Sequence, residues 1–72
     1  PEIRINGIAP GWVGHSGWDC AWDDLEANEA AKTLPLQRIG LPTDYAQVIF
    51  FLCAGADYMT GQTLIVDGGL LA

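Results

Sequence analysis

The 72-residue sequence predicts an α/β fold in which parallel strands are connected through helices. Two short apolar runs, residues 3–9 and 63–66, are each followed by a glycine-containing turn, which is typical of buried strands. Between them, residues 44–54 form a longer apolar segment that favours a helix. The order of strand, helical excursion, helix and strand is that of a βαβ crossover, which is expected to be right-handed with parallel strands.

The first predicted strand, residues 3–9, ends at a Pro-Gly turn. Pro10 cannot donate a hydrogen bond to a strand ladder, and Gly11 can adopt a positive φ. The isoleucines of this run favour a sheet that is covered on both faces. Ligands of open α/β sheets bind beyond the carboxyl ends of the strands. Residues 10–13 therefore lie where a ligand is expected.

The next residues, 14–17, read Gly-His-Ser-Gly and predict a polar loop with hinge-like glycines. Residues 18–34 predict one or two short amphipathic helices ended by Pro35, because Trp18, Trp22 and Leu25 recur at helical spacing. Five acidic side chains in the same segment point mostly in other directions, and they are most simply explained as a solvated face.

Residues 35–42 form a turn-rich connector, after which Thr43 is expected to cap a helix over residues 44–54. Gly55 is the expected C′ residue of that helix. Beyond its first turn the helix has almost no polar side chains, which predicts burial on all sides. A loop, the second strand and the sequence Asp67-Gly68-Gly69 complete the chain.

Composition excludes several functional classes. The formal charge is −6 with only three basic residues, which argues against binding to nucleic acid or to an anionic membrane. No apolar run reaches the ~20 residues that a membrane-spanning helix needs. Half of the residues are hydrophobic in a chain shorter than a usual domain, so we expect a piece of a larger core.

The two cysteines, Cys20 and Cys53, lack the spacing of metal ligands, so no metal site is expected. Ordinary thiols indicate a reducing compartment, and no signal peptide is visible, so we expect a cytoplasmic location.

Three stretches, taken together, resemble the short-chain dehydrogenase/reductases. They are Ile-Arg-Ile-Asn-Gly-Ile-Ala-Pro-Gly-Trp-Val (residues 3–13), Pro-Leu-Gln-Arg-Ile-Gly-Leu-Pro (35–42) and Tyr-Met-Thr-Gly-Gln-Thr-Leu-Ile-Val-Asp-Gly-Gly (58–69). They occur in the family's order and at about its spacing. Pteridine reductases and acyl-carrier ketoreductases carry similar strands, and sugar and steroid dehydrogenases come close, so the substrate class stays open.

The resemblance implies the C-terminal portion of a Rossmann-type doubly wound parallel sheet, with one domain fragment over residues 1–72. Residues 1–13 would supply a strand and the cofactor turn, 14–34 a substrate lid, and 35–72 a connector, helix, last strand and tail. The implied function is hydride transfer between NAD or NADP and a carbonyl, alcohol or imine carbon. The alternative is a family member that has lost catalysis and serves as a binding or regulatory subunit.

The resemblance assigns cofactor binding to the turn after the first strand, by Pro10, Gly11, Trp12, Val13 and His15. In the family the backbone at the Val13 position hydrogen-bonds the nicotinamide carboxamide, which needs one donor and one acceptor. The family often has Thr where this chain has His15. Either His15 or the next residue, Ser16, contacts the cofactor, or neither does.

Three tryptophans and Ser16 are the candidate substrate contacts: Trp12, Ser16, Trp18 and Trp22. The tryptophans either wall an apolar or aromatic substrate or pack lid helices onto the body. No catalytic residue is expected within these 72 residues, because the family's Asn-Ser-Tyr-Lys set and Gly-rich turn lie upstream. Neither Tyr45 nor Tyr58 begins a Tyr-x-x-x-Lys sequence. The resemblance assigns mainly structural roles to Asp67 and to Arg38.

The partners implied are the N-terminal remainder of the same protein, a small-molecule substrate and further copies of the chain. In the family, the helix over residues 44–54 and the last strand commonly form a two-fold interface. We therefore expect a homo-oligomer, specifically a tetramer, with this helix and residues 63–72 in one interface.

Overall fold

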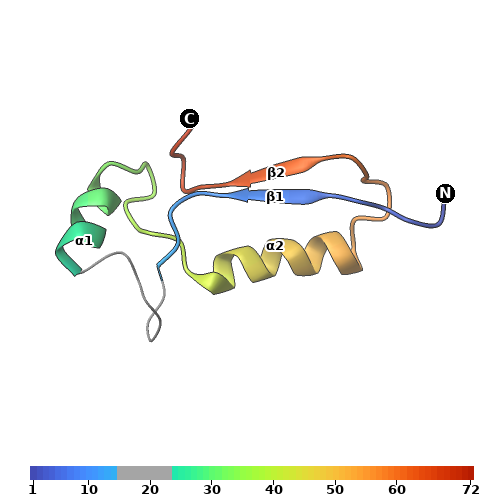
Figure 1. Ribbon diagram of the computed structural model, residues 1–72, viewed down its shortest axis with the longest axis horizontal. Helices are drawn as coiled ribbons and strands as arrows, with labels where there is room; N and C mark the ends of the chain where they lie inside the picture. The colour runs from blue at the N-terminus through green and yellow to red at the C-terminus, as the bar shows by residue number, and fades with distance from the viewer. Residues whose placement is uncertain (15–23) are drawn as a thin grey trace.

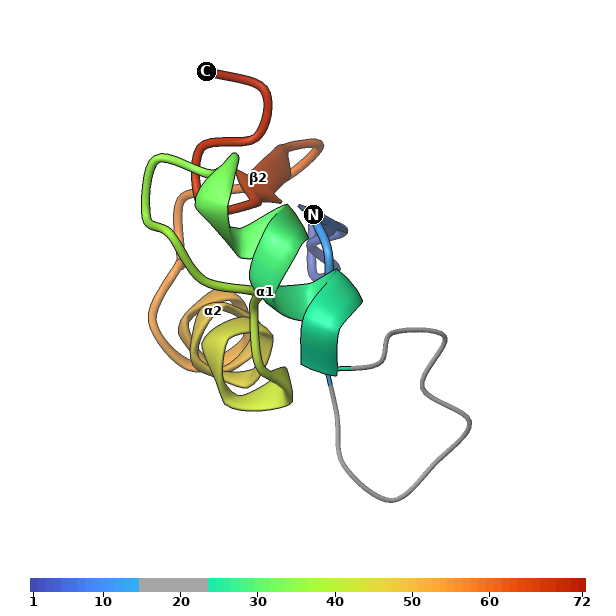
Figure 2. The ribbon, with the colours of Figure 1, turned by 90° about the vertical axis from the view of Figure 1, so that its left-hand side faces the viewer.

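A computed structural model describes residues 1–14 and 24–72 of the chain. Its elements, in chain order, are the strand β1 (Gly7–Pro10), the helices α1 (Asp24–Lys32) and α2 (Pro42–Ala54), and the strand β2 (Thr63–Val66). Figure 1 shows the strands side by side, α2 alongside β1, and α1 beyond the carboxyl ends of both strands. The end-on view in Figure 2 places α1 in front of the strands and α2 to one side of them.

The two strands pair in parallel, which confirms the predicted α/β class. Gly7 lies opposite Thr63, and Pro10 lies opposite Val66. β2 has the predicted bounds. Because the strands run in the same direction, their carboxyl ends meet at one edge of the sheet, and the first turn of α2 lies at that same edge (Figure 1).

The first strand starts later than predicted. The residues before Gly7 bond to the loop that follows α2 instead of to a strand. The Ile5 N–H donates to Thr60 Oγ1 at 3.1 Å, and the Gly61 N–H donates to the Ile5 carbonyl at 2.7 Å. Ile3 and Ile5 are exposed, so the part of the chain that the structure describes does not supply the predicted cover on both faces.

The first strand also ends later than predicted, because Pro10 is its last residue. A proline is tolerated at this position, because the bond to β2 that follows it is donated by the N–H of the next residue. The Gly11 N–H makes that bond, to the Val66 carbonyl at 3.0 Å.

α2 begins at Pro42, and Leu41 rather than the predicted Thr43 is its N-cap. A proline at the first helical position has a suitable fixed φ and lacks only an N–H that would have no helical partner. The residue before a proline favours extended backbone, and Leu41 has φ −105° and ψ 156°. The Asp44 carboxylate reaches back to accept a bond from the Leu41 N–H at 2.7 Å.

α2 ends at Ala54, as predicted, and the Gly55 N–H donates to the Phe51 carbonyl at 2.9 Å. Gly55 has φ −139°, so it is not the left-handed C′ residue that was expected. Sequence reasoning missed the role of Arg4. Its guanidinium donates to the carbonyls of Leu52 and Ala56, at 3.1 and 2.7 Å, where a cation also complements the helix dipole.

α1 covers part of the region where one or two helices were predicted. It ends at Lys32, three residues before Pro35, and the Thr33 and Leu34 N–H groups bond the carbonyls three residues earlier. Lys32 pairs with Glu29 at 3.3 Å, an exposed ion pair that contributes little stability. The predicted helical positions 18–23 lie outside the described residues.

α2 is not buried on all sides by this chain. Its inward stripe contains the buried Tyr45 and the half-buried Val48 and Leu52. Three large apolar side chains, Ile49, Phe50 and Phe51, are exposed on the outside, with Phe50 at 74%. The sheet therefore covers only one stripe of the helix. Among the described residues, no helix is both long and apolar enough to cross a lipid bilayer.

Candidate functional site

The turn over residues 10–14 leaves β1 next to the point where β2 also ends. A Cβ atom on Gly11 would lie 2.8 Å from both the Cα and the Cβ of Asp67. Gly11 is not among the residues with positive φ, so the turn does not use the positive φ that glycine permits. The turn requires glycine because the backbone passes too close to Asp67 for any side chain.

The turn continues into a short parallel bridge between Val13 and Gly40 of the connector. The Gly40 N–H donates to the Trp12 carbonyl at 3.0 Å, and the Gly14 N–H donates to the Gly40 carbonyl at 2.8 Å. Gly40 thus holds the peptide on each side of Val13.

The backbone polar groups of Val13 itself point away from this bridge. A trans peptide is planar and directs its C=O and N–H in opposite directions, and residues 1–14 and 24–72 contain no cis peptide. Since Gly40 binds the Trp12 C=O and the Gly14 N–H, the Val13 N–H and C=O both face the opposite side. Within the described part of the chain, neither takes part in a hydrogen bond. Val13 therefore presents one donor and one acceptor side by side.

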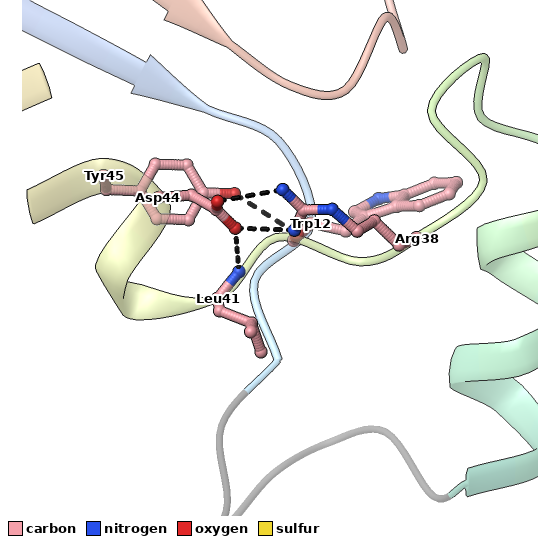
Figure 3. A network of polar contacts seen from close by, with 5 residues as sticks. All are labelled: Trp12, Arg38, Leu41, Asp44 and Tyr45. Atoms are coloured by element: carbon pink, nitrogen blue, oxygen red, sulfur yellow. Dashed lines mark hydrogen bonds and ion pairs between the residues drawn. The ribbon is translucent and has the colours of Figure 1, made fainter. Parts of the chain in front are cut away.

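A polar network lies behind the turn (Figure 3). The Tyr45 hydroxyl, from the first turn of α2, donates to the Trp12 carbonyl at 3.4 Å. The Arg38 guanidinium donates twice to the Asp44 carboxylate, at 2.7 and 2.9 Å. Burial, followed by the nearby Asp44 charge, raises the pKa of Tyr45 above its usual value, so its hydroxyl stays protonated as a donor.

Hydrogen bonds from Arg38, and then from the Leu41 N–H, lower the pKa of Asp44 from 3.8 to about 2. The same pairing raises the pKa of Arg38. Because the folded-state pKa of Asp44 lies below the unfolded value, its ionised form stabilises the fold. That contribution is complete above about pH 4 and is lost as the pH falls toward about 2.

We expect Asp44→Asn to lower the urea midpoint of the full-length protein near neutral pH. The difference from wild type should shrink between about pH 4 and pH 2, where the wild-type carboxylate also loses its charge. Asp57→Asn is the matched control, because Asp57 is exposed and has no ion pair or side-chain hydrogen bond among the described residues. A difference that stayed constant down to pH 2 would contradict this account.

A cavity of about 150 Å³ lies between the connector, the start of α2 and the end of β2. Its lining combines apolar, acidic and basic groups: Leu36, Arg38, Gly40, Asp44, Tyr45, Val66, Asp67 and Gly68. Of the predicted cofactor and substrate residues, the four that the structure describes, Pro10, Gly11, Trp12 and Val13, do not line it. Among the described residues, no group of three or more His, Cys, Asp or Glu side chains could hold a metal ion.

The structure brings together four of the predicted site residues in one turn: Pro10, Gly11, Trp12 and Val13. The other predicted contacts lie outside the described residues: His15, Ser16, Trp18 and Trp22. Asp67 uses its carboxylate to accept bonds from the Gly69 N–H at 2.9 Å and the Leu71 N–H at 3.0 Å. This agrees with the structural role that the resemblance implies for it.

Sequence reasoning missed Tyr45 and Gly40 as parts of the site. Tyr45 falls in an apolar helix and Gly40 in a turn-rich connector, so neither carries a local signal of its contact with the turn. The pairing of Arg38 with Asp44 could have been suspected from two opposite charges on either side of a helix start.

Comparisons with known proteins agree on one family. The family model described as Enoyl-(Acyl carrier protein) reductase matches residues 1–71. The chain is 46% identical over 70 residues to the 3-oxoacyl-(acyl-carrier-protein) reductase FabG of Chlamydia pneumoniae, covering 96% of this chain and 28% of that protein. It is 44% identical over 70 residues to Dehydrogenase/reductase SDR family member 4 of Homo sapiens, covering 94% of this chain and 25% of that protein.

A solved structure of a small-chain dehydrogenase in complex with NADPH is similar with a TM-score of 0.76 and 31% identity, covering 93% of this chain and 32% of that one. This likeness confirms the predicted Rossmann-type class. The chain spans about a quarter of the length of the curated relatives named above. The match over residues 1–71 shows that the chain belongs to the short-chain dehydrogenase/reductase family.

Proposed function

We propose that this chain is the C-terminal part of an NAD(P)-dependent oxidoreductase and forms the nicotinamide side of its cofactor site. The supporting observation is the pair of unused backbone groups on Val13, one donor and one acceptor, at the carboxyl edge of a parallel sheet. A primary carboxamide needs that combination, with its C=O accepting from the Val13 N–H and its NH₂ donating to the Val13 C=O. A relative whose structure contains NADPH supports the same cofactor class.

The residues around Val13 fit such a ligand. Gly11 lets the turn lie against the end of β2, and Gly40 fixes the two peptides that flank Val13. When bound, the nicotinamide would accept or donate a hydride at a carbonyl, alcohol or imine carbon of the substrate. The chain's own contribution is to bind and orient the ring. The acid–base residues are proposed to lie upstream, in the family's Tyr-x-x-x-Lys sequence.

The substrate side of the site is proposed to include Trp12, together with Ser16, Trp18 and Trp22 from the segment assigned as a lid. His15 is proposed as a further cofactor contact. The named relatives include a 3-oxoacyl reductase, which favours an oxo substrate without fixing its class. Residues 1–72 are proposed as one fragment of a single domain, and the location as cytoplasmic.

We further propose a homo-oligomer, specifically a tetramer, in which the outer face of α2 (Ile49, Phe50 and Phe51) contacts a second copy. The exposure of three adjacent large apolar side chains supports this, because such a face is seldom left open to water. A two-fold contact would cover the face on both subunits at once.

The test is NAD(P)H binding and turnover by the full-length protein. Binding is followed by calorimetry, and turnover by the loss of reduced-cofactor absorbance with a panel of ketone, oxoacyl and imine substrates. Binding with turnover supports the oxidoreductase. Binding without turnover, together with no upstream Tyr-x-x-x-Lys, supports the alternative of an inactive binding or regulatory subunit. Absence of NAD(P)H binding contradicts the proposal that this chain forms part of an NAD(P) site.

A further inference from the structure

Tyr45 lies directly against the connection between the cofactor turn and the connector. Its side chain is 8% exposed, and its hydroxyl donates to the Trp12 carbonyl at 3.4 Å (Figure 3). A Cβ atom on Gly40 would overlap this hydroxyl and would lie 2.8 Å from the Tyr45 Cζ. The outer end of the ring therefore packs against the bare Cα of Gly40.

The Trp12 carbonyl matters because it shares a rigid peptide plane with the Val13 N–H. Among the described residues, that oxygen accepts from the Gly40 N–H at 3.0 Å and from the Tyr45 hydroxyl at 3.4 Å. Any rotation of the peptide that moved the oxygen away from them would turn the Val13 N–H by the same angle. The direction of the Val13 N–H is thus set by the groups that bond the Trp12 carbonyl on the opposite side of the backbone.

The position of Tyr45 is itself fixed by its surroundings. It stands in the first turn of α2, beside Asp44, which is held by two bonds from Arg38 and one from the Leu41 N–H. Because these bonds fix the first turn of α2, the Tyr45 ring cannot easily shift if the cofactor turn moves. Tyr45 and Gly40 together form a fixed support behind Val13.

We propose that Tyr45 is a positioning residue for the nicotinamide: by holding the Trp12 carbonyl and packing against Gly40, it aims the Val13 N–H at the carboxamide. The inference rests on the proposed cofactor role of Val13. It adds a residue that contacts neither cofactor nor substrate and acts through the backbone of the turn.

The experiment compares Tyr45→Phe with wild type in the full-length protein, using two ligands. One ligand is NAD(P)H, and the other is the matching ADP-ribose, which lacks the nicotinamide ring and cannot reach Val13. Loss of the hydroxyl should weaken NAD(P)H binding about two- to fourfold, the scale of one weak neutral hydrogen bond. ADP-ribose affinity should not change.

Tyr58→Phe is the matched control, because it removes the same atom from a fully exposed side chain that has no hydrogen bond among the described residues. It should leave both affinities unchanged. The amide NMR signal of Val13 in the cofactor-free protein gives a second measurement. It should shift in Tyr45→Phe and stay in place in Tyr58→Phe, because only the first substitution removes a hydrogen bond from the Trp12–Val13 peptide.

Three outcomes would overturn the inference. An equal loss for NAD(P)H and ADP-ribose would show a general structural role, and unchanged NAD(P)H affinity would show that the hydroxyl does not position the turn. If wild type bound NAD(P)H no better than ADP-ribose, the proposed role of Val13 would fail and this inference with it. The wild-type comparison therefore separates failure of the proposed function from failure of the Tyr45 role.

Discussion

Gly11→Val is expected to weaken NAD(P)H binding by about tenfold or more, a cost of roughly 1.4 kcal/mol. The Cβ of the new side chain would lie 2.8 Å from the Cα and Cβ of Asp67, so the end of β1 must move away from the end of β2. Overpacking of this kind typically costs about 1–3 kcal/mol, and here the obstruction includes backbone, which cannot rotate aside. Because Val13 follows two residues later, its donor and acceptor move with the turn. Calorimetric titration of the full-length protein with NAD(P)H measures the effect.

Gly7→Ala is the control, in the strand that leads into this turn. A Cβ on Gly7 would meet only Thr63 Oγ1 at 3.7 Å, which is an ordinary contact, and Gly7 does not have a positive φ. This variant should bind NAD(P)H as wild type does. Unchanged affinity in Gly11→Val would refute the proposal that this turn holds the cofactor. Equal losses in both variants would show that the effect does not depend on the close approach of Gly11 to Asp67.

Much of the fold could be predicted because it is encoded in local patterns. The second strand has the predicted bounds, since a short β-branched run ends at a sequence rich in glycine. The parallel pairing follows from the helical crossover between the strands. The C-terminal end of α2 was also placed correctly at Ala54.

The errors occurred where a contact distant in sequence decides the outcome. Residues 3–6 have strand-like composition, yet the described chain offers them a loop and not a strand to pair with. Gly11 was explained by backbone freedom, whereas its requirement is the close approach of Asp67, 56 positions later in the chain. No local pattern reports such an approach.

The candidate site was predictable in the same uneven way. The turn itself was identified from its Pro-Gly sequence and its family resemblance. Its support from Tyr45 was not, because the hydroxyl reaches Trp12 across 33 positions of sequence. In an otherwise apolar helix, a tyrosine is explained equally well as a core residue. Only the structure shows which group its hydroxyl bonds.

Phe50→Asp is expected to dissociate the proposed oligomer. Phe50 is 74% exposed on the outer face of α2, between the exposed Ile49 and Phe51. In a two-fold interface the same position occurs on both subunits. The substitution would therefore place two carboxylates in one interface, where they are buried or repel each other. Truncating a central aromatic contact commonly costs about 2 kcal/mol or more, and an unpaired charge adds its desolvation cost. Sedimentation velocity at micromolar concentration should show subunits of lower mass than wild type.

Leu36→Asp is the control that separates interface loss from general damage. It places the same charge on an exposed apolar side chain of the connector, outside both α2 and residues 63–72, and should leave the assembly intact. Phe50→Leu, which keeps an apolar side chain, should also remain assembled. If Phe50→Asp sediments as wild type does, α2 is covered by another part of its own subunit. In that case the exposure seen in these 72 residues would reflect a missing intrasubunit neighbour, and the tetramer would need a different surface.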